Sequence, residues 1–272
     1  MRQFSASPFE MFASLWRNRE LIQVSTKRQV IGRYRGSVLG ILWSFFNPLF
    51  MLAVYTFVFS EVFKARWNPG SDSKVEFALA LFAGLIIFNL FAECINAAPS
   101  IILSNQNYVK KVVFPLEILP FVVFLSSLYH ALISLVVWFV AYFLFFGVPH
   151  LTVFYLPLIV IPLGLFTMGL SWALASLGVF LRDVSQFIGV LTAVLMFMSP
   201  IFYPLASLPE KYRYILYANP LTAAIEQVRD ILFWGKAPDF MVLSVGWIFA
   251  SIVAFLGFFW FQKTRKGFSD VL

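Results

Sequence analysis

The sequence predicts an all-α integral membrane protein with six transmembrane helices, and three observations carry this prediction. Of the 272 residues, 61% are hydrophobic and only 12% are charged, whereas a soluble domain is about half apolar and about a quarter charged. Six apolar stretches approach or exceed the roughly 20 residues needed to cross a bilayer. Basic residues gather in the segments on one side of these stretches. These features exclude an ordinary soluble enzyme, a disordered chain and a disulfide scaffold.

The expected spans are not equally regular. The second carries Asn89, Glu93 and Asn96, and the fifth is interrupted near its outer end by Pro200 and Pro204. A proline removes a backbone hydrogen bond from a helix interior. The expected spans are residues 38–63, 77–98, 118–146, 152–181, 187–203 and 240–261.

The distribution of charge predicts which side each loop occupies. An even number of spans places both termini on one side, where the connecting segments hold thirteen Lys and Arg against five acidic residues. The opposite loops, together with Glu61, hold seven of each. Because cytoplasmic loops carry the excess of Lys and Arg, both termini are expected in the cytoplasm. Topology thus explains the basic charge, and no nucleic-acid partner is expected. The chain divides into a cytoplasmic segment, 1–36, and a transmembrane domain, 37–272.

The segment before the first span has an amphipathic pattern. Phe9, Phe12 and Trp16 recur at helical spacing, with six Arg and Lys around and after them. This pattern predicts an N-terminal interfacial helix that places its aromatic face at the lipid headgroups and its cations near anionic lipid. A solvated basic tail is the alternative, but it does not explain the aromatic spacing.

Two loops are too apolar to be free linkers. The cytoplasmic loop 99–117 is expected to contact another protein or the helical bundle. The outer segment 204–239 is too long for a turn, and it combines several prolines with a helix-like run at 223–233. Because irregular backbone survives at membrane depth only where it is buried or faces water, this segment predicts two short re-entrant helices.

The sequence contains no catalytic motif that we could identify. Gly235-Lys236 lacks the upstream glycine and the following Ser or Thr of a phosphate-binding loop. His130, His150 and Cys94 are too few for a metal centre, and one cysteine cannot form an intrachain disulfide. We therefore expect no catalytic residue, no metal and no cofactor in this chain, and any uphill transport must draw its energy from a partner or an ion gradient.

Glu93 is the ionisable residue that lies clearly within a predicted span. Such a carboxylate is costly in hydrocarbon and is a functional candidate by default. Asn89, Glu93 and Asn96 share one helix face, which fits either a translocation path or proton site, or a seam of interhelical hydrogen bonds. The seam is favoured, because no other predicted span offers a charged partner. His130 in the third span is expected to be hydrogen-bonded rather than a metal ligand.

Aromatic residues crowd the first and fifth spans. Aromatic faces stack on sugar rings, so a lining of them can pass a glycan without holding it tightly. For any single ring, packing against lipid or anchoring at the interface is the favoured alternative. The candidates for a channel lining are Trp43, Phe46, Phe50, Phe197, Phe202 and Tyr203.

Two stretches resemble the type-2 ABC-transporter permeases that export polysaccharide such as O-antigen, capsule or teichoic acid. The first is GRYRGSVLGILW at 32–43, followed by Asn47-Pro48. The second is SPIFYP at 199–204, followed by NPLT at 219–222 and by Arg229. Chain length, six spans and the basic amphipathic N-terminus are similar to this family over nearly the whole chain.

The resemblance implies an ATP-driven exporter of O-antigen-like polysaccharide in the cytoplasmic (inner) membrane. This chain would be the permease, present as a homodimer with two copies of a separate ABC ATPase that binds ATP and Mg. The substrate would be a polysaccharide linked through pyrophosphate to a polyprenyl lipid. The alternatives are export of teichoic acid, capsule, a drug or another lipid, and, less favoured, a membrane glycan-transferring enzyme.

The same resemblance implies three sites. Substrate access is expected where Arg forks suit phosphate, although plain positive-inside anchoring also explains these cations; the residues are Arg33, Tyr34, Arg35, Gly36 and Gly40. Coupling to the ATPase is expected in the N-terminal helix, in the 104–117 loop and in the turn after the fourth span, at Tyr108, Lys110, Lys111, Arg182 and Asp183. An outer gate is expected at Pro204, Asn219, Pro220, Glu226 and Arg229, with Arg229 paired to Glu226 or Asp230.

Overall fold

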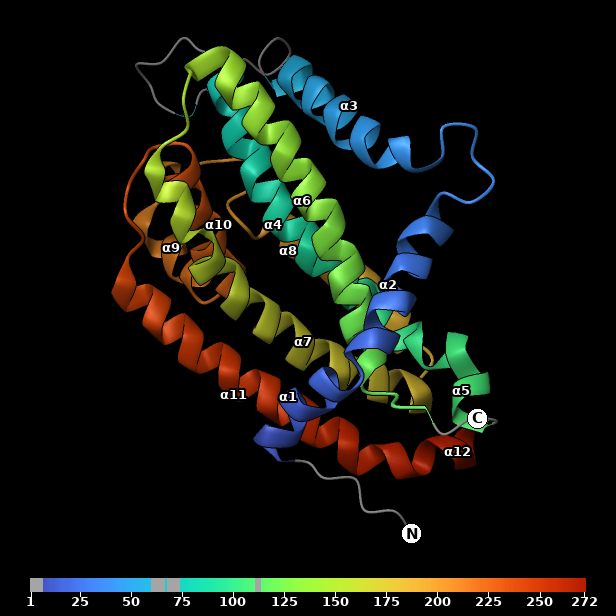
Figure 1. The fold of residues 1–272 in the computed structure, drawn as a ribbon. Coiled ribbons are helices and arrows are strands. Elements are labelled where there is room, and N and C mark those ends of the chain that lie inside the picture. The colour runs from blue at the N-terminus through green and yellow to red at the C-terminus, as the bar shows by residue number, and fades with distance from the viewer. Residues whose placement is uncertain (1–6, 60–66, 68–73, 111–113) are drawn as a thin grey trace.

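The computed structural model describes residues 7–59, 67, 74–110 and 114–272, which fold almost entirely into helices (Figure 1). No β-strand occurs within these residues, so the predicted all-α class is confirmed. The α-helices are α1 (Pro8–Arg17), α2 (Arg19–Arg33), α3 (Trp43–Phe57), α4 (Lys74–Ile101), α5 (Gln106–Lys110), α6 (Ile118–Phe146), α7 (Leu156–Phe180), α8 (Val184–Phe197), α9 (Glu210–Tyr217), α10 (Pro220–Leu232), α11 (Phe240–Thr264) and α12 (Phe268–Val271). The 3₁₀ helices are η1 (Gly40–Leu42), η3 (Leu103–Asn105), η4 (Leu151–Tyr155), η5 (Leu205–Ser207) and η6 (Arg265–Gly267).

Five helical segments of the described chain are long and apolar enough to cross a membrane. They coincide with the first, second, third, fourth and sixth predicted spans; the third has the predicted bounds, and the others differ at one or both ends. The multi-pass prediction thereby holds for these five. The segments are Gly40–Phe57, Val75–Ser100, Ile118–Phe146, Leu151–Phe180 and Phe240–Val271.

The fifth predicted span ends earlier than expected. Helix α8 has 14 residues, and at about 1.5 Å per residue it extends only about 21 Å. The chain leaves the helix at Met198, and the next residues form turns. The prediction of a helix to residue 203 was wrong because Pro200 disfavours helical backbone at Ser199.

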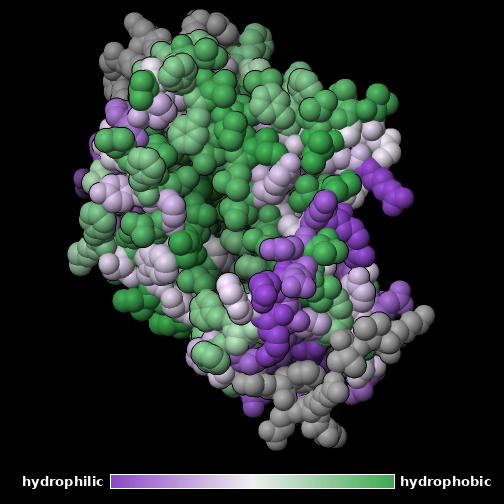
Figure 2. Space-filling model, viewed as in Figure 1, coloured by the Kyte–Doolittle hydropathy of each residue, from purple (hydrophilic) through white to green (hydrophobic). Residues whose placement is uncertain are grey.

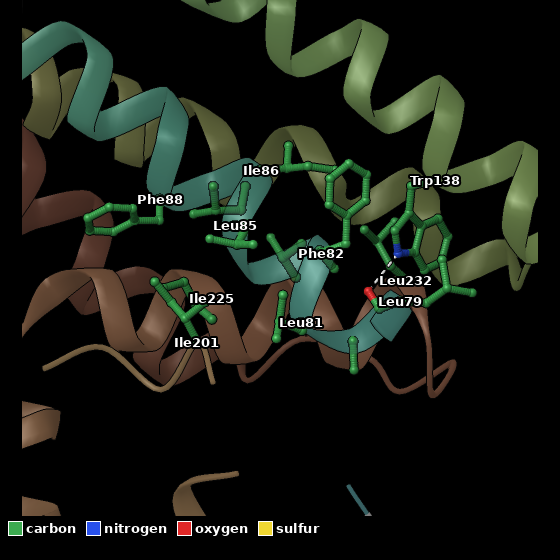
Figure 3. Packing of buried hydrophobic residues seen from close by; sticks show 14 of the residues in the cluster. Leu79, Leu81, Phe82, Leu85, Ile86, Phe88, Trp138, Ile201, Ile225 and Leu232 are labelled. Carbon is green, nitrogen blue, oxygen red and sulfur yellow. Dashed lines mark hydrogen bonds between the residues drawn. The ribbon is translucent and has the colours of Figure 1, made fainter. Parts of the chain in front are cut away.

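Helix α4 is the centre of the bundle. Its apolar stretch is 83% buried, against 11% for the first span, and it contacts α3, α6, α7, α8 and α10. Figure 3 shows its side chains, among them Leu79 and Phe82, packed against α6 and α10. The buried indole N–H of Trp138 donates to the Leu79 carbonyl at 2.9 Å, so this polar atom is satisfied inside the apolar core.

Glycines allow α7 and α11 to touch along their backbones. A Cβ atom at Gly257 would overlap the carbonyl oxygen of Gly169, and a Cβ at Gly169 would overlap the backbone of Val253. Small residues at such crossings let helices in lipid gain contact through close packing. Gly178 meets Pro99 in the same way, which brings α7 against α4.

The N-terminal segment is helical, as predicted, but it is divided at Asn18 into α1 and α2. Met11 and Ser14 are buried against the bundle, whereas Phe9 and Trp16 are 81% and 74% exposed. The aromatic face predicted from the sequence therefore exists and points away from the protein. Figure 2 shows polar residues gathered on one part of the visible face, where α1 and α2 lie in Figure 1, and apolar residues over most of the rest.

The close approach of α7 and α11 predicts the effect of a single added methyl group. Gly257→Ala is expected to destabilise the protein by about 2 kcal/mol, in the range typical of overpacking, and so to lower the melting temperature in detergent. Gly246→Ala on the same helix is the matched control, because nothing lies within 4 Å of its added Cβ. Equal melting temperatures for the two variants would contradict this packing.

Candidate functional site

Arg229 is the most completely buried charged side chain of the described residues, with 0% exposure. Its Nε donates to the Ala80 carbonyl at 2.7 Å, its Nη2 donates to the Ile201 carbonyl at 2.8 Å, and its Nη1 donates to the Pro200 carbonyl. Nη1 also donates to Oε1 of Glu226 at 2.9 Å. One guanidinium thus joins α4, α10 and the turn after α8. We call Arg229 and these four partners the Arg229 cluster.

Neighbouring aromatic and glycine residues complete the surroundings of this guanidinium. Its Cζ lies 4.3 Å from the centre of the Trp67 ring, a cation–π contact. A Cβ at Gly84 would lie 2.6 Å from Nη2, so glycine leaves the space that the guanidinium occupies. The expected pairing of Arg229 with Glu226 is confirmed, whereas Oδ1 of Asp230 lies 3.4 Å from Nζ of Lys236.

Asn219 connects the SPIFYP and NPLT stretches. Its Oδ1 accepts from the Leu221 backbone N–H at 3.0 Å and caps α10, and its Nδ2 donates to Ser199 Oγ at 2.9 Å. Pro220 follows at the first helical position, where no backbone donor is needed. Pro204 precedes η5, and its carbonyl accepts from the Ser207 backbone. The SPIFYP and NPLT stretches are therefore in direct contact.

A second site lies where α2 ends. Arg33 forms an ion pair with Glu93 of α4 through Nη2, and its Nη1 lies 2.8 Å from Nδ1 of His130 on α6. The same Nδ1 is 3.7 Å from Glu93 Oε1. The sequence indicated no charged partner for Glu93 in another span, and the partner in the structure is Arg33, which reaches it from outside the spans. The expectation that His130 is hydrogen-bonded is confirmed.

These residues line a cleft of about 430 Å³ between α2, α3, α4 and α6. Its wall includes Arg33 and Tyr34 of the expected access site together with Asn89, Glu93 and Asn96 of the polar seam. Asn96 also accepts from the Thr192 hydroxyl at 3.1 Å, which extends the seam to α8. The structure thus joins two features that the sequence treated separately.

The remaining residues of the expected access site lie on the turn between α2 and α3. Arg35 is exposed and lies outside the described wall of the cleft. Gly36 and Gly40 have φ of +87° and +52°, and the space that a Cβ would occupy is open at both. Because L-residues with a Cβ rarely adopt this backbone, glycine is the residue that suits both positions.

The six candidate channel aromatics do not form a continuous lining within one chain. Phe50 is 72% and Phe197 64% exposed, and Trp43 and Phe46 are exposed on α3 as well. Phe202 instead stacks between Phe197 and Phe59, at ring distances of 5.7 and 5.8 Å. The Tyr203 hydroxyl donates to the Phe197 carbonyl at 2.9 Å.

The residues expected to couple to an ATPase differ in exposure. Arg182 and Asp183 are exposed on the turn between α7 and α8. Tyr108 faces inward, where its hydroxyl accepts from Arg28 at 3.0 Å and its ring stacks on Phe114 at 4.2 Å. Lys110 ends α5, whereas Lys111 lies outside the described residues.

Sequence reasoning missed a buried ion pair at the same end of the molecule. Glu117 is 6% exposed, and it accepts from Arg265 Nη1 at 2.5 Å and from the Ser14 hydroxyl at 2.7 Å. Its carbonyl accepts from the indole N–H of Trp172 at 2.8 Å. The pair joins α1, α6, α7 and the end of α11. A carboxylate flanked by apolar residues at the start of a span was the signal that could have found it, because it must be paired when buried.

The fold and these sites define a multi-pass membrane protein with a buried arginine cluster and a charged cleft. The chain belongs to the ABC-2 type transporter family, whose sequence profile matches residues 20–233. It is 29% identical to the O-antigen export system permease protein RfbA of Klebsiella pneumoniae, over 93% of this chain and 95% of that protein. It is 26% identical to the protein of the same name from Myxococcus xanthus, over 83% and 85%. The family resemblance seen in the sequence is therefore confirmed.

The Arg229 cluster predicts a large effect of losing one side chain. Arg229→Gln removes the charge and leaves buried carbonyls without donors, so we expect a loss of about 3–5 kcal/mol of stability and a lower melting temperature in detergent. Lys236→Gln, which removes a cation whose side chain is 67% exposed, is the control and should change little. A wild-type melting temperature for Arg229→Gln would show that the cluster does not stabilise the fold.

Proposed function

We propose that this chain is the membrane permease of an ATP-driven exporter that moves an O-antigen-like, lipid-linked polysaccharide across the cytoplasmic membrane. The observation that carries the proposal is similarity to proteins named O-antigen export permeases over more than nine-tenths of both chains. The five apolar spans and the ABC-2 family match support a transport role for the chain. The sequence has no phosphate-binding loop, so ATP and Mg are assigned to a partner ATPase.

The proposed complex contains two copies of this chain and two ATPase subunits. The exposed Arg182-Asp183 turn supports an ATPase contact there, because charged residues on a short turn are available to a partner. The buried Phe268 of α12 lies against Phe180, with 5.9 Å between ring centres. Phe180 ends α7, so this contact holds the residue that precedes the turn. The exposed aromatic faces of α3 and α8 offer apolar surface for the second copy or for lipid.

The proposed topology has both termini in the cytoplasm, with α1 lying in the interface of the inner membrane. The exposed aromatic face of α1 and the cations of α2 support this placement. The fifth predicted span is assigned to α8 together with residues 198–204. In this irregular segment the carbonyls of Pro200 and Ile201 accept from Arg229. Helices α9 and α10 are assigned as the re-entrant pair at the outer side, and irregular backbone paired within the protein is compatible with membrane depth.

The proposed access site is the charged cleft at the end of α2. A diphosphate in the cytoplasmic leaflet is expected to meet Arg33 and Arg35, whose planar forks suit phosphate oxygens. Tyr34, on the cleft wall, is available to donate a hydrogen bond, and the open backbone at Gly36 and Gly40 leaves room for a headgroup. The exposed aromatics of α3 and α8 are then the surface along which sugars pass.

Charge reversal at the access site tests this part of the proposal. In cells that export the glycan, Arg33→Glu with Arg35→Glu is expected to reduce surface polysaccharide at least tenfold and to accumulate lipid-linked glycan inside. Arg19→Glu with Lys27→Glu, two exposed cations of α2, makes the same charge change and controls for altered anchoring. Normal export by the Arg33 and Arg35 double variant would show that these cations serve only as anchors.

Co-purification tests the assignment of a partner. The full chain is expected to be isolated with its cognate ATPase in a complex of two copies each, and the purified chain alone is expected to show no ATP hydrolysis. Asp183→Arg should weaken the complex, because it reverses an exposed charge at the proposed contact, whereas Glu210→Arg, at an exposed carboxylate of α9, should not. An Asp183→Arg complex as stable as wild type would remove this turn from the proposed interface.

A further inference from the structure

The guanidinium of Arg33 is already occupied in the cleft. Nη2 is paired with the Glu93 carboxylate and Nη1 lies against His130. Of the described residues that line the cleft, Arg33 and Glu93 are the two that carry a full charge at neutral pH, and their charges cancel. A phosphate group that enters such a neutral cleft gains little attraction unless Arg33 first leaves its carboxylate.

The geometry fixes how His130 takes part. Arg33 has only donors, so the Nδ1 atom that it contacts at 2.8 Å is the acceptor and carries no proton. Nε2 is buried without a hydrogen-bond partner in the described structure. Tyr34 and Tyr129 are the other titratable rings against His130, with centroids at 6.0 and 5.7 Å. If Arg33 moves away, Nδ1 loses this donor and is left beside Oε1 of Glu93, 3.7 Å away.

The exposure of the pair makes this exchange feasible. The side chains of Arg33 and Glu93 are 48% and 26% exposed, so the protein leaves the guanidinium open to a ligand in the cleft. Exposed ion pairs contribute little, less than about tenfold in an equilibrium. A diphosphate offers more acceptor oxygens and more negative charge than one carboxylate, and it makes the stronger bidentate contact with Arg. The carboxylate can therefore be displaced by such a ligand.

We propose that Glu93 is an internal stand-in anion, which holds Arg33 against α4 until the diphosphate of a lipid-linked substrate displaces it. We call the Arg33–Glu93 pair the latch. The inference rests on the proposed function, and it adds that ligand capture is coupled to release of α2 from the central helix. The release occurs beside the positive-φ glycines Gly36 and Gly40, on the turn that connects α2 to α3.

Binding measurements test the latch. The full chain with its ATPase, in nanodiscs of phosphatidylcholine, is titrated with farnesyl diphosphate, with farnesol as the control for the apolar tail. Glu93→Gln should tighten binding of the diphosphate about threefold to tenfold, because it removes the competing charge. Arg33→Gln should weaken binding at least tenfold, and with Glu93→Gln added binding should stay weaker than in the wild type, because the cation is still missing.

The outcomes separate the latch from the access site. If Arg33→Gln weakens binding but Glu93→Gln does not tighten it, the latch is wrong and the access site stands. If Arg33→Gln leaves binding unchanged, the access site itself is wrong, and the latch fails with it. Nanodiscs with phosphatidylglycerol test the other source of phosphate: loss of farnesyl diphosphate binding there would show that the cleft prefers a phospholipid headgroup and would overturn the proposal.

A second measurement leaves Glu93 and Arg33 intact. Gln29 of α2 and Ser100 of α4 line one cleft on the cytoplasmic side of the latch, and both are exposed. With cysteine at both positions, a short bifunctional maleimide should link α2 to α4, while the buried native Cys94 stays unreactive. Farnesyl diphosphate should lower the yield of the link severalfold, and farnesol should not. An unchanged yield at saturating diphosphate would show that capture does not release α2.

Discussion

The part of the molecule around α10 and the turn after α8 depends on the pairing of one buried guanidinium with backbone carbonyls. Lipid offers no donors to a carbonyl that a helix leaves unpaired, and it offers no counter-charge to an arginine. The turn after α8 exposes the carbonyls of Pro200 and Ile201, and Arg229 satisfies both while it also bonds to Ala80 and Glu226. The unpaired carbonyls after α8 thus receive donors from Arg229, and the buried guanidinium receives acceptors from them. A short α8 and a buried Arg are tolerated together, although neither is tolerated alone.

Helix α4 bonds to an arginine from another segment near each of its ends. Near its N-terminal end the Ala80 carbonyl accepts from Arg229, and toward its C-terminal end Glu93 accepts from Arg33. The two arginines come from segments far apart in sequence, and both bond to the same rigid helix. Close packing of Gly178 on Pro99 holds the C-terminal end of α4 against α7. Movement of α4 relative to its neighbours therefore requires that one of these contacts change, and the Arg33–Glu93 pair is the more exposed of the two ion pairs.

Local patterns were predictable from the sequence, and contacts between distant residues were not. Five spans follow from length and apolar composition, and the exposed Phe9 and Trp16 follow from helical periodicity, because both properties belong to short stretches of chain. The end of the fifth span was misplaced because its apolar residues outweighed the break at Pro200. The partner of Glu93 lies 60 residues away and that of Glu117 lies 148 away. Sequence indicates that such carboxylates need partners, but only packing selects which cation reaches them.

Arg33 and Arg229 differ in burial, and this difference determines how easily each can leave its carboxylate. Both Arg33 and Arg229 bond to a carboxylate, and both lie in stretches that resemble one transporter family. Arg229 has 0% exposure and four oxygen acceptors, so separating it from Glu226 leaves a charge in an apolar interior, at a cost that keeps the cluster closed. Arg33 is 48% and Glu93 26% exposed, so the protein does not enclose this pair as it encloses Arg229. The first pair therefore holds the fold in one state, and the second is the pair that we propose exchanges its anion where the substrate arrives.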